Sequence, residues 1–285
     1  MNIRVAQPPP AGRNGHAGYI MTAETPGFFH ASDGTPLYGV WHTATGTPRD
    51  SVVLTPALLD ERRTASAAWV SLARHLAAHG FPVLRFEFRG EGESLGDGSR
   101  RLWTDLNQDL LAAGQFASRS APSKKVHLVA LRLGASAAWQ TVHTQSAPDS
   151  FSWASLLAIA PVVKGAAQER LWRLRTKIRK EMGGQQNFGL ASSNAEELDF
   201  DGLPIHAQFM EAVKTFDLTK IKPAGSRTHV IQISFKEDLS AETQALVQAG
   251  TPNVTAQGLK LEPFWDRLEV IDTKALNEAV LSRLS

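Results

Sequence analysis

The sequence predicts an α/β protein with a mostly parallel central sheet led by an antiparallel hairpin, helices on both faces and a helical cap insertion. Three observations predict this class. Short apolar runs alternate with longer segments of helical periodicity. The turn sequence SDGT at 32–35 separates the first two strand-like runs, which is typical of a hairpin. The interval 162–225, between two predicted core strands, is too long for a loop.

The predicted elements follow one another in a regular order. Residues 1–26 are rich in Pro, Gly and Ala and are expected to form a flexible tail. The predicted strands are 27–31, 36–42, 51–55, 82–88, 126–131, 155–161, 229–235 and 253–260. The predicted helices are 69–79, which Gly80 ends, 102–116, a segment from 134 onward, 168–182, 242–248 and 274–284. We therefore expect a core of 27–161 and 226–285, with 162–225 as a helical cap over the carboxyl ends of the strands.

The composition is that of an ordinary globular protein without a membrane span or a nucleic-acid partner. A chain of 285 residues, 42% apolar and 20% charged, can bury one large core with an insertion. No run approaches the roughly 18 apolar residues of a membrane span, and no apolar signal core follows the first charges, so we expect a cytoplasmic location. The net charge of +2 is too small to indicate a nucleic-acid partner.

Metals and cofactors have little support in the sequence. There is no cysteine, which excludes disulfides, thiolate catalysis and Cys-ligated metals. His75 and His79 lie one turn apart on a predicted helix, but no third ligand accompanies them. We expect neither a metal nor a cofactor.

The segment around Arg132 joins a predicted strand to a predicted helix. It reads Ala130-Leu131-Arg132-Leu133-Gly134, with small residues at both ends of the frame. This is the frame of the G-x-S-x-G turn, in which small flanking residues let strand and helix approach and the central serine is a nucleophile. A guanidinium is a permanent cation that only donates hydrogen bonds, so Arg132 cannot attack a carbonyl.

Several segments carry a resemblance to a known family. FEFRGEGESLGD at 86–97 resembles the loop after the fourth strand of α/β-hydrolases of the serine-aminopeptidase-like group. The turn ALRLGA, PVVKG at 161–165 and PFW at 263–265 resemble, more narrowly, the hydrolase-like proteins associated with the exosortase (PEP-CTERM) sorting system. The resemblance covers about residues 30 to 285 and implies the α/β-hydrolase fold. Arginine at the turn is usual in that subfamily, whose name rests on its fold.

A hydrolase of this fold also needs an acid and a histidine. The resemblance places the acid at Asp238, after the strand 229–235. The segment where the histidine belongs, 261–266, reads LEPFWD, and no histidine follows His229. We expect a degenerate triad and a non-hydrolytic ligand-binding or accessory protein, and the resemblance implies a link to exosortase and exopolysaccharide pathways. The alternative is a true ester, thioester or amide hydrolase with a non-standard nucleophile such as Ser94, which otherwise stabilises a turn, so enzymatic activity stays open.

One interpretation of Arg132 is an anion site. The backbone N–H groups of Leu133, Ala57 and Leu58 lie where this fold stabilises an oxyanion, and such donors suit negative charge. With Arg132 they would bind a carboxylate, phosphate or sulfate. Trp265 would then form the floor of an apolar pocket for an acyl chain or ring.

The other interpretation is a buried ion pair. An unpaired buried guanidinium costs several kcal/mol, so Arg132 needs a partner, and the candidates are Asp238, Glu237 and Glu262. Trp265 would then fill the core. Both interpretations hold together if Asp238 binds one edge of the guanidinium and a ligand binds the other.

The predicted helix 168–182 is amphipathic and basic. Its apolar face carries Leu171, Leu174, Ile178 and Met182, and its basic residues are Arg170, Arg173, Arg175, Lys177, Arg179 and Lys180. One interpretation packs the apolar face onto the cleft. Another is contact with a membrane surface or an acidic partner through Arg173, Arg175 and Arg179, and a third is steering of an anionic ligand toward Arg132.

Overall fold

The computed structural model describes residues 23–182, 197–200, 203–223 and 225–284. Most of the predicted tail, 1–22, lies outside this part. The first strand begins at Glu24, slightly before the predicted end of the tail at 26. Its backbone hydrogen bonds to the second strand hold these residues in the sheet.

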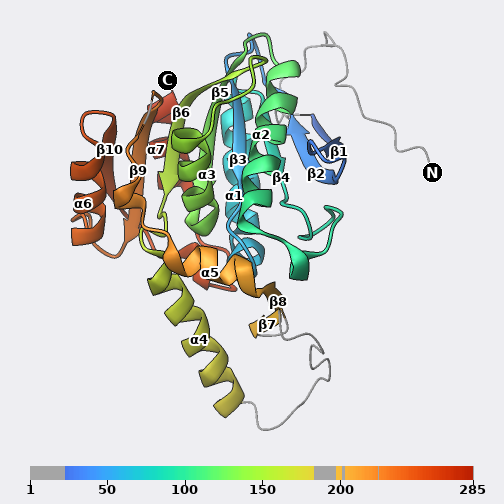
Figure 1. Cartoon of the computed structure of the whole chain (residues 1–285). Helices are drawn as coiled ribbons and strands as arrows, with labels where there is room; N and C mark the ends of the chain where they lie inside the picture. The colour runs from blue at the N-terminus through green and yellow to red at the C-terminus, as the bar shows by residue number, and fades with distance from the viewer. Residues whose placement is uncertain (1–22, 183–196, 201–202, 224, 285) are drawn as a thin grey trace.

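An eight-stranded sheet forms the centre of the molecule (Figure 1). Its strand order is β1-β2-β4-β3-β5-β6-β9-β10. β1 and β2 form an antiparallel hairpin, β2 pairs antiparallel with β4, and every other pair in this sheet is parallel. The strands are β1 (Glu24–His30), β2 (Pro36–His42), β3 (Ser51–Thr55), β4 (Val83–Phe86), β5 (Lys125–Leu131), β6 (Ser152–Ile159), β9 (Arg227–Ser234) and β10 (Val254–Lys260).

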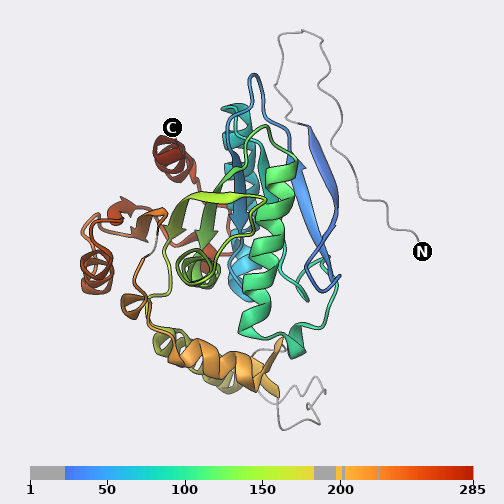
Figure 2. The same cartoon turned by 45° about the horizontal axis from the view of Figure 1, so that its top comes forward.

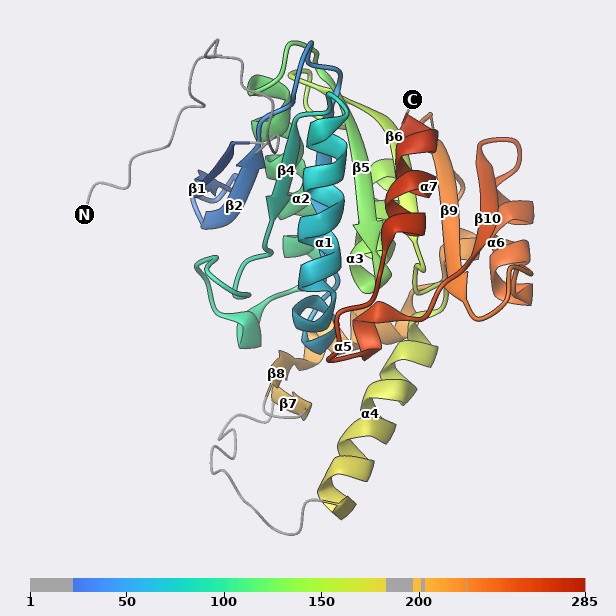
Figure 3. The same cartoon turned by 180° about the vertical axis from the view of Figure 1, so that it is seen from behind.

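Helices cover both faces of the sheet, as predicted (Figures 1 and 3). α1 and α7 pack into the core on one face, and α2, α3 and α6 pack into the core on the other. The covering helices are α1 (Asp60–Ala78), α2 (Trp103–Arg119), α3 (Arg132–Thr144), α6 (Ala241–Gly250) and α7 (Lys274–Leu284). The short 3-10 helices η1 (Gly98–Arg100) and η3 (Phe264–Asp266) lie in the loops before α2 and after β10. All five residues of β3 are buried, which is expected of a parallel strand covered twice.

The insertion between β6 and β9 lies at the carboxyl ends of the parallel strands (Figures 1 and 2). Its described elements are α4 (Gly165–Met182), β7 (Glu197–Phe200), β8 (Leu203–His206), α5 (Ala207–Thr215) and η2 (Leu218–Lys220). β7 and β8 form an antiparallel ladder, so the insertion is not purely helical as predicted. The ring of Phe209 on α5 lies 5.6 Å from that of Trp103 on α2, which fixes α5 over the core.

α1 begins at Asp60, well before the predicted start at 69. Its first turns read DERRTAS, which has no apolar stripe and therefore no visible periodicity. The predicted stop is confirmed, because Gly80 adopts a positive φ of 87°. The N–H groups of Gly80 and Phe81 donate to the carbonyls of Ala77 and Leu76, the pair of bonds of a Schellman motif.

Candidate functional site

The turn between β5 and α3 has the conformation that its sequence predicts. Arg132 has a φ of +54°, a strained value for a residue with a side chain. A Cβ at Gly134 would lie 1.9 Å from the carbonyl oxygen of Pro56, so only glycine lets α3 approach the end of β3 this closely. The turn therefore presents Arg132 at the carboxyl edge of the sheet, where the fold would present a nucleophile.

The guanidinium of Arg132 is almost fully hydrogen-bonded. Its Nε and Nη2 donate to the two carboxylate oxygens of Glu61, both at 3.2 Å. Nη2 also donates to Oε1 of Gln168 on α4 at 3.2 Å, and Nη1 donates to the carbonyl of Ala160 at 3.1 Å. These bonds use most of the donors of a guanidinium, so little capacity is left for a ligand.

Trp265 lies in the segment 261–266, where the resemblance to hydrolases leads one to expect a histidine, and it contacts Arg132. The guanidinium carbon is 5.0 Å from the centre of the Trp265 ring, a cation–π contact. The Thr64 hydroxyl donates to the carbonyl of Trp265, which ties η3 to α1. Trp265 is buried with Phe264 in the core on this side of the sheet. Of the two predicted roles for this ring, these contacts match core filling.

The partner of Arg132 corrects the prediction. The sequence offered Asp238, Glu237 or Glu262, but the ion pair is with Glu61. Burial raises the pKa of the Glu61 carboxyl, and the charge of Arg132 opposes that rise. Glu61 was missed because it lies before the predicted start of this helix at 69. The acidic pair Asp60 and Glu61 is a typical first-turn signal that could have revealed the helix start.

The predicted triad acid faces solvent. Asp238 and Glu237 are exposed in the loop after β9, and the carbonyl of Asp238 accepts a hydrogen bond from the Gln232 side chain at 3.0 Å. Glu262 pairs with Arg267 instead of Arg132. The loops after β9 and β10 thus direct these carboxylates away from the turn.

The predicted backbone donors lie inside the core. Ala57, Leu58 and Leu133 are all buried, around the ends of β3 and β5. No contact of their N–H groups with an anion is tested by this structure, so the predicted oxyanion-type site stays a prediction. Arg132 does not share it, because its guanidinium points to Glu61 and Gln168.

Ser94 is a turn residue. Its Oγ donates to the carbonyl of Glu87 at 2.6 Å and accepts from the N–H of Tyr38 at 2.8 Å. Among the residues that the structure describes, no histidine is hydrogen-bonded to this hydroxyl. The geometry matches the turn-stabilising interpretation of Ser94.

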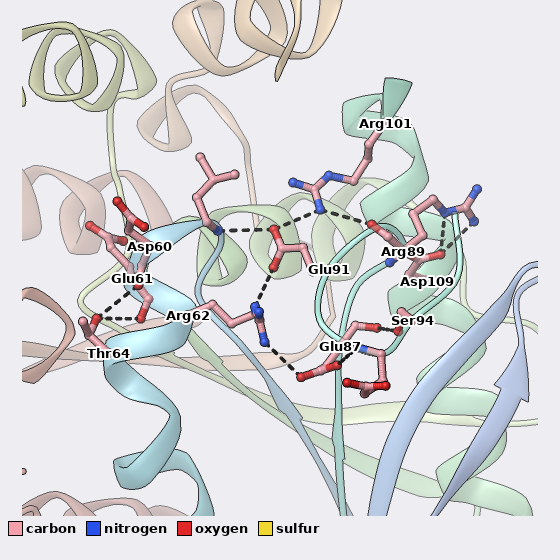
Figure 4. A network of polar contacts seen from close by, with 12 residues as sticks. Asp60, Glu61, Arg62, Thr64, Glu87, Arg89, Glu91, Ser94, Arg101 and Asp109 are labelled. Atoms are coloured by element: carbon pink, nitrogen blue, oxygen red, sulfur yellow. Dashed lines mark hydrogen bonds and ion pairs between the residues drawn. The ribbon is translucent and has the colours of Figure 1, made fainter. Parts of the chain in front are cut away.

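A second polar cluster surrounds a hollow of about 410 Å³ beside the first turn of α1 (Figure 4). Glu91 is its centre. One carboxylate oxygen accepts from the N–H of Leu59 at 3.2 Å and from Nη1 of Arg101 at 3.0 Å, and the other lies 3.3 Å from Nε of Arg62. Nη1 of Arg62 also donates to Glu87 at 2.9 Å. Arg101 is buried, and its Nε has no hydrogen-bond partner.

The loop after β4 is fixed by a buried ion pair. Nε and Nη2 of Arg89 donate to one oxygen of Asp109 on α2, at 2.9 and 2.7 Å, and the Arg89 N–H donates to the other at 2.9 Å. Burial raises the pKa of Asp109, and Arg89 opposes that rise. Gly90 has a φ of +70°, and a Cβ there would lie 2.3 Å from the nitrogen of Gly98, so the loop closes tightly on itself. The sequence motif at 86–97 therefore builds one wall of the hollow.

The basic helix differs from its predicted packing. Leu174 and Ile178 are exposed, so the apolar face does not pack onto the cleft. Gln168 and Trp172 are buried instead. Arg175 pairs with Asp266 at 2.6 Å and Arg173 pairs with Glu169, while the side chain of Arg179 lies outside the described part.

The part of the chain that the structure describes holds no metal-binding cluster of side chains and no membrane-spanning helix. No group of three or more His, Asp or Glu side chains there is placed to bind a metal ion. None of the helices described there combines the length and apolar composition that crossing a membrane requires. Cytoplasmic location stays a prediction.

Solved structures resemble this chain although no protein-family model and no curated protein matches it. Est1E from Butyrivibrio proteoclasticus, solved with bound ferulic acid, aligns with a TM-score of 0.64 and 14% identity, over 90% of this chain and 97% of its own. The α/β hydrolase GrgF from Penicillium sp. sh18 aligns at 0.63 and 13% identity, over 92% and 98%. The Pyrococcus furiosus esterase Pf2001 aligns at 0.61 and 15% identity, over 99% and 97%. At these identities the likeness shows the fold alone.

Proposed function

We propose that this chain of α/β-hydrolase fold is a non-hydrolytic ligand-binding or accessory protein. The observation that carries the proposal is the Arg132 side chain, which stands at the tip of the turn and is bound by Glu61, Gln168 and Ala160. Trp265 occupies the side of the cation where a histidine would work. Loss of the nucleophile and base of a triad lowers turnover by about a million-fold, so only background hydrolysis is expected.

The hydrolase alternative is tested with an active-serine probe. The intact protein is incubated with a fluorophosphonate and, separately, with p-nitrophenyl esters of increasing chain length. We expect no labelling above a heat-denatured sample and no turnover above buffer. Ser94→Ala should behave as wild type in both assays, because the Ser94 hydroxyl is bonded to the backbone of Glu87 and Tyr38. Labelling of any serine in the native protein, above all labelling that Ser94→Ala abolishes, would refute a non-hydrolytic role.

An anionic or acyl ligand has room in the hollow next to α1, which Arg132 does not line. The hollow next to α1 is lined by Arg62, Arg63 and Arg101, and Arg63 is largely exposed. The guanidinium groups of Arg62 and Arg63 at the hollow support a carboxylate or phosphate group as the ligand there, because such groups accept charge-assisted hydrogen bonds from guanidinium. Glu91 already holds Arg62 and Arg101 in place and so orients the donors before a ligand arrives.

Calorimetric titration with inorganic phosphate and with octanoate tests the ligand site. Arg63→Gln and Arg101→Gln should each raise the Kd of the bound probe at least tenfold. Arg100→Gln is the matched control, because Arg100 is the exposed neighbour of Arg101 and does not line the hollow. Equal Kd values in all variants, or no binding of either probe, would rule out this ligand site and leave the absence of hydrolysis as a separate question.

The proposed link to a pathway rests on sequence motifs alone. The ALRLGA turn, PVVKG and PFW resemble exosortase-associated hydrolase-like proteins, which supports a role linked to exosortase and exopolysaccharide pathways. Deletion of the gene for this chain should then alter the surface display of exosortase-sorted proteins or the yield of exopolysaccharide. Complementation by Ser94→Ala would show that the role needs no Ser94 nucleophile.

A further inference from the structure

α4 presents its apolar stripe to solvent. Gln168 and Trp172 face the core, and Gln168 reaches Arg132. Leu174 and Ile178 lie on another side of the helix and are 53% and 44% exposed. α4 projects away from the sheet (Figures 1 and 3). An apolar stripe directed away from its own core needs another contact to bury it.

Positive charge surrounds this stripe. The sequence of α4 holds six basic and two acidic residues. Of the basic residues, Arg170, Arg173 and Lys177 are exposed. Of the acidic residues, Glu169 is mostly buried and pairs with Arg173, and the exposed Glu181 lies 3.9 Å from Lys177. The exposed surface of α4 is therefore apolar along one line and cationic beside it.

A second exposed apolar group stands close to the base of α4. Leu268 and Val270, in the loop after η3, are 90% and 83% exposed. This loop follows Asp266, which pairs with Arg175 of α4 at 2.6 Å. Arg267 in this loop is also exposed but pairs with Glu262, and Glu269, between Leu268 and Val270, is exposed as well. The ion pair therefore links the apolar and basic surface of α4 to a second pair of exposed apolar side chains.

We propose that α4, assisted by the 267–270 loop, docks this protein onto an anionic lipid surface. Leucine and isoleucine side chains insert at the boundary of the acyl chains, and the arginines and Lys177 bind the headgroups. Charge complementarity selects this occupant, because a second copy of the chain would bring equally cationic α4 residues against these. Basic residues near such a surface attract it additively, so Arg170, Arg173 and Lys177 strengthen the insertion of the apolar side chains.

Vesicle co-sedimentation of the full chain tests the proposal. We expect binding to vesicles of phosphatidylcholine with 30% phosphatidylglycerol, at least tenfold weaker binding to phosphatidylcholine alone, and loss of binding as salt is raised. The double variant Leu174→Ser, Ile178→Ser should weaken binding at least tenfold. Arg173→Gln with Lys177→Gln should weaken it by a similar factor.

Matched control variants distinguish docking through α4 from non-specific adsorption to vesicles. Phe235→Ser removes an exposed apolar side chain from the loop after β9, and Lys124→Gln with Lys125→Gln removes two exposed charges at the start of β5. Both controls should bind as wild type, and circular dichroism melting should be similar for all variants. The proposal fails if wild type does not bind anionic vesicles, if the stripe variant binds as wild type, or if the controls lose binding equally. It also fails if light scattering shows a dimer that only the stripe variant breaks, because a second copy would then be the occupant.

Discussion

Glu61 in the first turn of α1 holds Arg132 at the turn between β5 and α3 through two hydrogen bonds of 3.2 Å. The two residues are far apart in sequence, and both are largely buried. A buried pair of this kind loses its hydration, and it persists because each charge satisfies the other. The tip of the turn between β5 and α3 is thus held by a largely buried ion pair.

Removing Glu61 should be strongly destabilising. Glu61→Ala leaves the Arg132 cation buried with only neutral partners, Gln168 and Ala160. We expect a loss of about 3 to 5 kcal/mol in the free energy of unfolding, measured by urea denaturation. Glu242→Ala, which removes an acid from the first turn of α6, should cost under about 1 kcal/mol.

Removing both charges distinguishes the contribution of the ion pair to stability from the contribution of side-chain packing. In the double variant Arg132→Met, Glu61→Leu no charge is left unpaired, so the stability should return toward wild type. A double variant less stable than Glu61→Ala alone would show that the other contacts of Arg132, and not its pairing with Glu61, dominate.

Gly134→Ala should disrupt the turn. The added methyl group would meet the Pro56 carbonyl oxygen at 1.9 Å, and backbone cannot move aside as a flexible side chain can. We expect a loss of about 3 kcal/mol or more in thermal or urea unfolding. Thr144→Ala, at the exposed end of the same helix, should lie within about 1 kcal/mol of wild type. Equal stabilities for the two variants would contradict the close approach of α3 to β3.

Lowering the pH should lower the free energy of unfolding, because buried histidines are harder to protonate than those of the unfolded chain. Burial lowers the pKa of His42 to about 4, although the charge of Glu24 opposes this. In the unfolded chain a histidine titrates near about 6.5, so between these values the unfolded state binds more protons and stability falls as pH falls. Burial also lowers the pKa of His229 to about 4, with the same sign.

The histidine effect is measured as a difference between variants. Between pH 7 and pH 5, His42→Leu should lose about 2 kcal/mol less unfolding free energy than wild type. Comparing the two proteins cancels the titration of carboxylates that both contain. Val40→Ala, a buried change without a titratable group in the same strand, should keep the wild-type pH dependence. The same slope in His42→Leu and wild type would show that the pKa of His42 in the native state equals its value in the unfolded chain.

Arg89→Lys should loosen the wall of the hollow. Lysine cannot reproduce the paired bonds of Nε and Nη2 to Asp109, which is fully buried. We expect a loss of about 2 to 3 kcal/mol and faster proteolysis within 89–101. Arg100→Lys, an exposed change nearby, should affect neither. Unchanged proteolysis would mean that the glycine contacts alone hold this loop.

Local patterns made most of the fold predictable. The strands 36–42 and 51–55 and the helix 274–284 match their predicted ranges, because each combines a clear apolar pattern with clear ends. The start of α1 was missed because its polar first turns carry no such pattern. The sequence left three interpretations of the stripe of α4 open, because periodicity shows that a helix has an apolar face but not what that face contacts.

The sequence by itself determined the α/β class, the turn at Arg132 and the absence of a histidine after β10. The first two depend on patterns of neighbouring residues, and the third depends only on which residue types the segment contains. Only the tertiary structure decided that Glu61 is the partner of Arg132, that Gln168 and Trp265 complete its surroundings, and that Asp238 faces solvent. The physical reason is that an ion-pair partner is selected by proximity in the folded chain. Several carboxylates satisfy the same chemical need, and only the packing of α1 against the sheet brings one of them to the guanidinium.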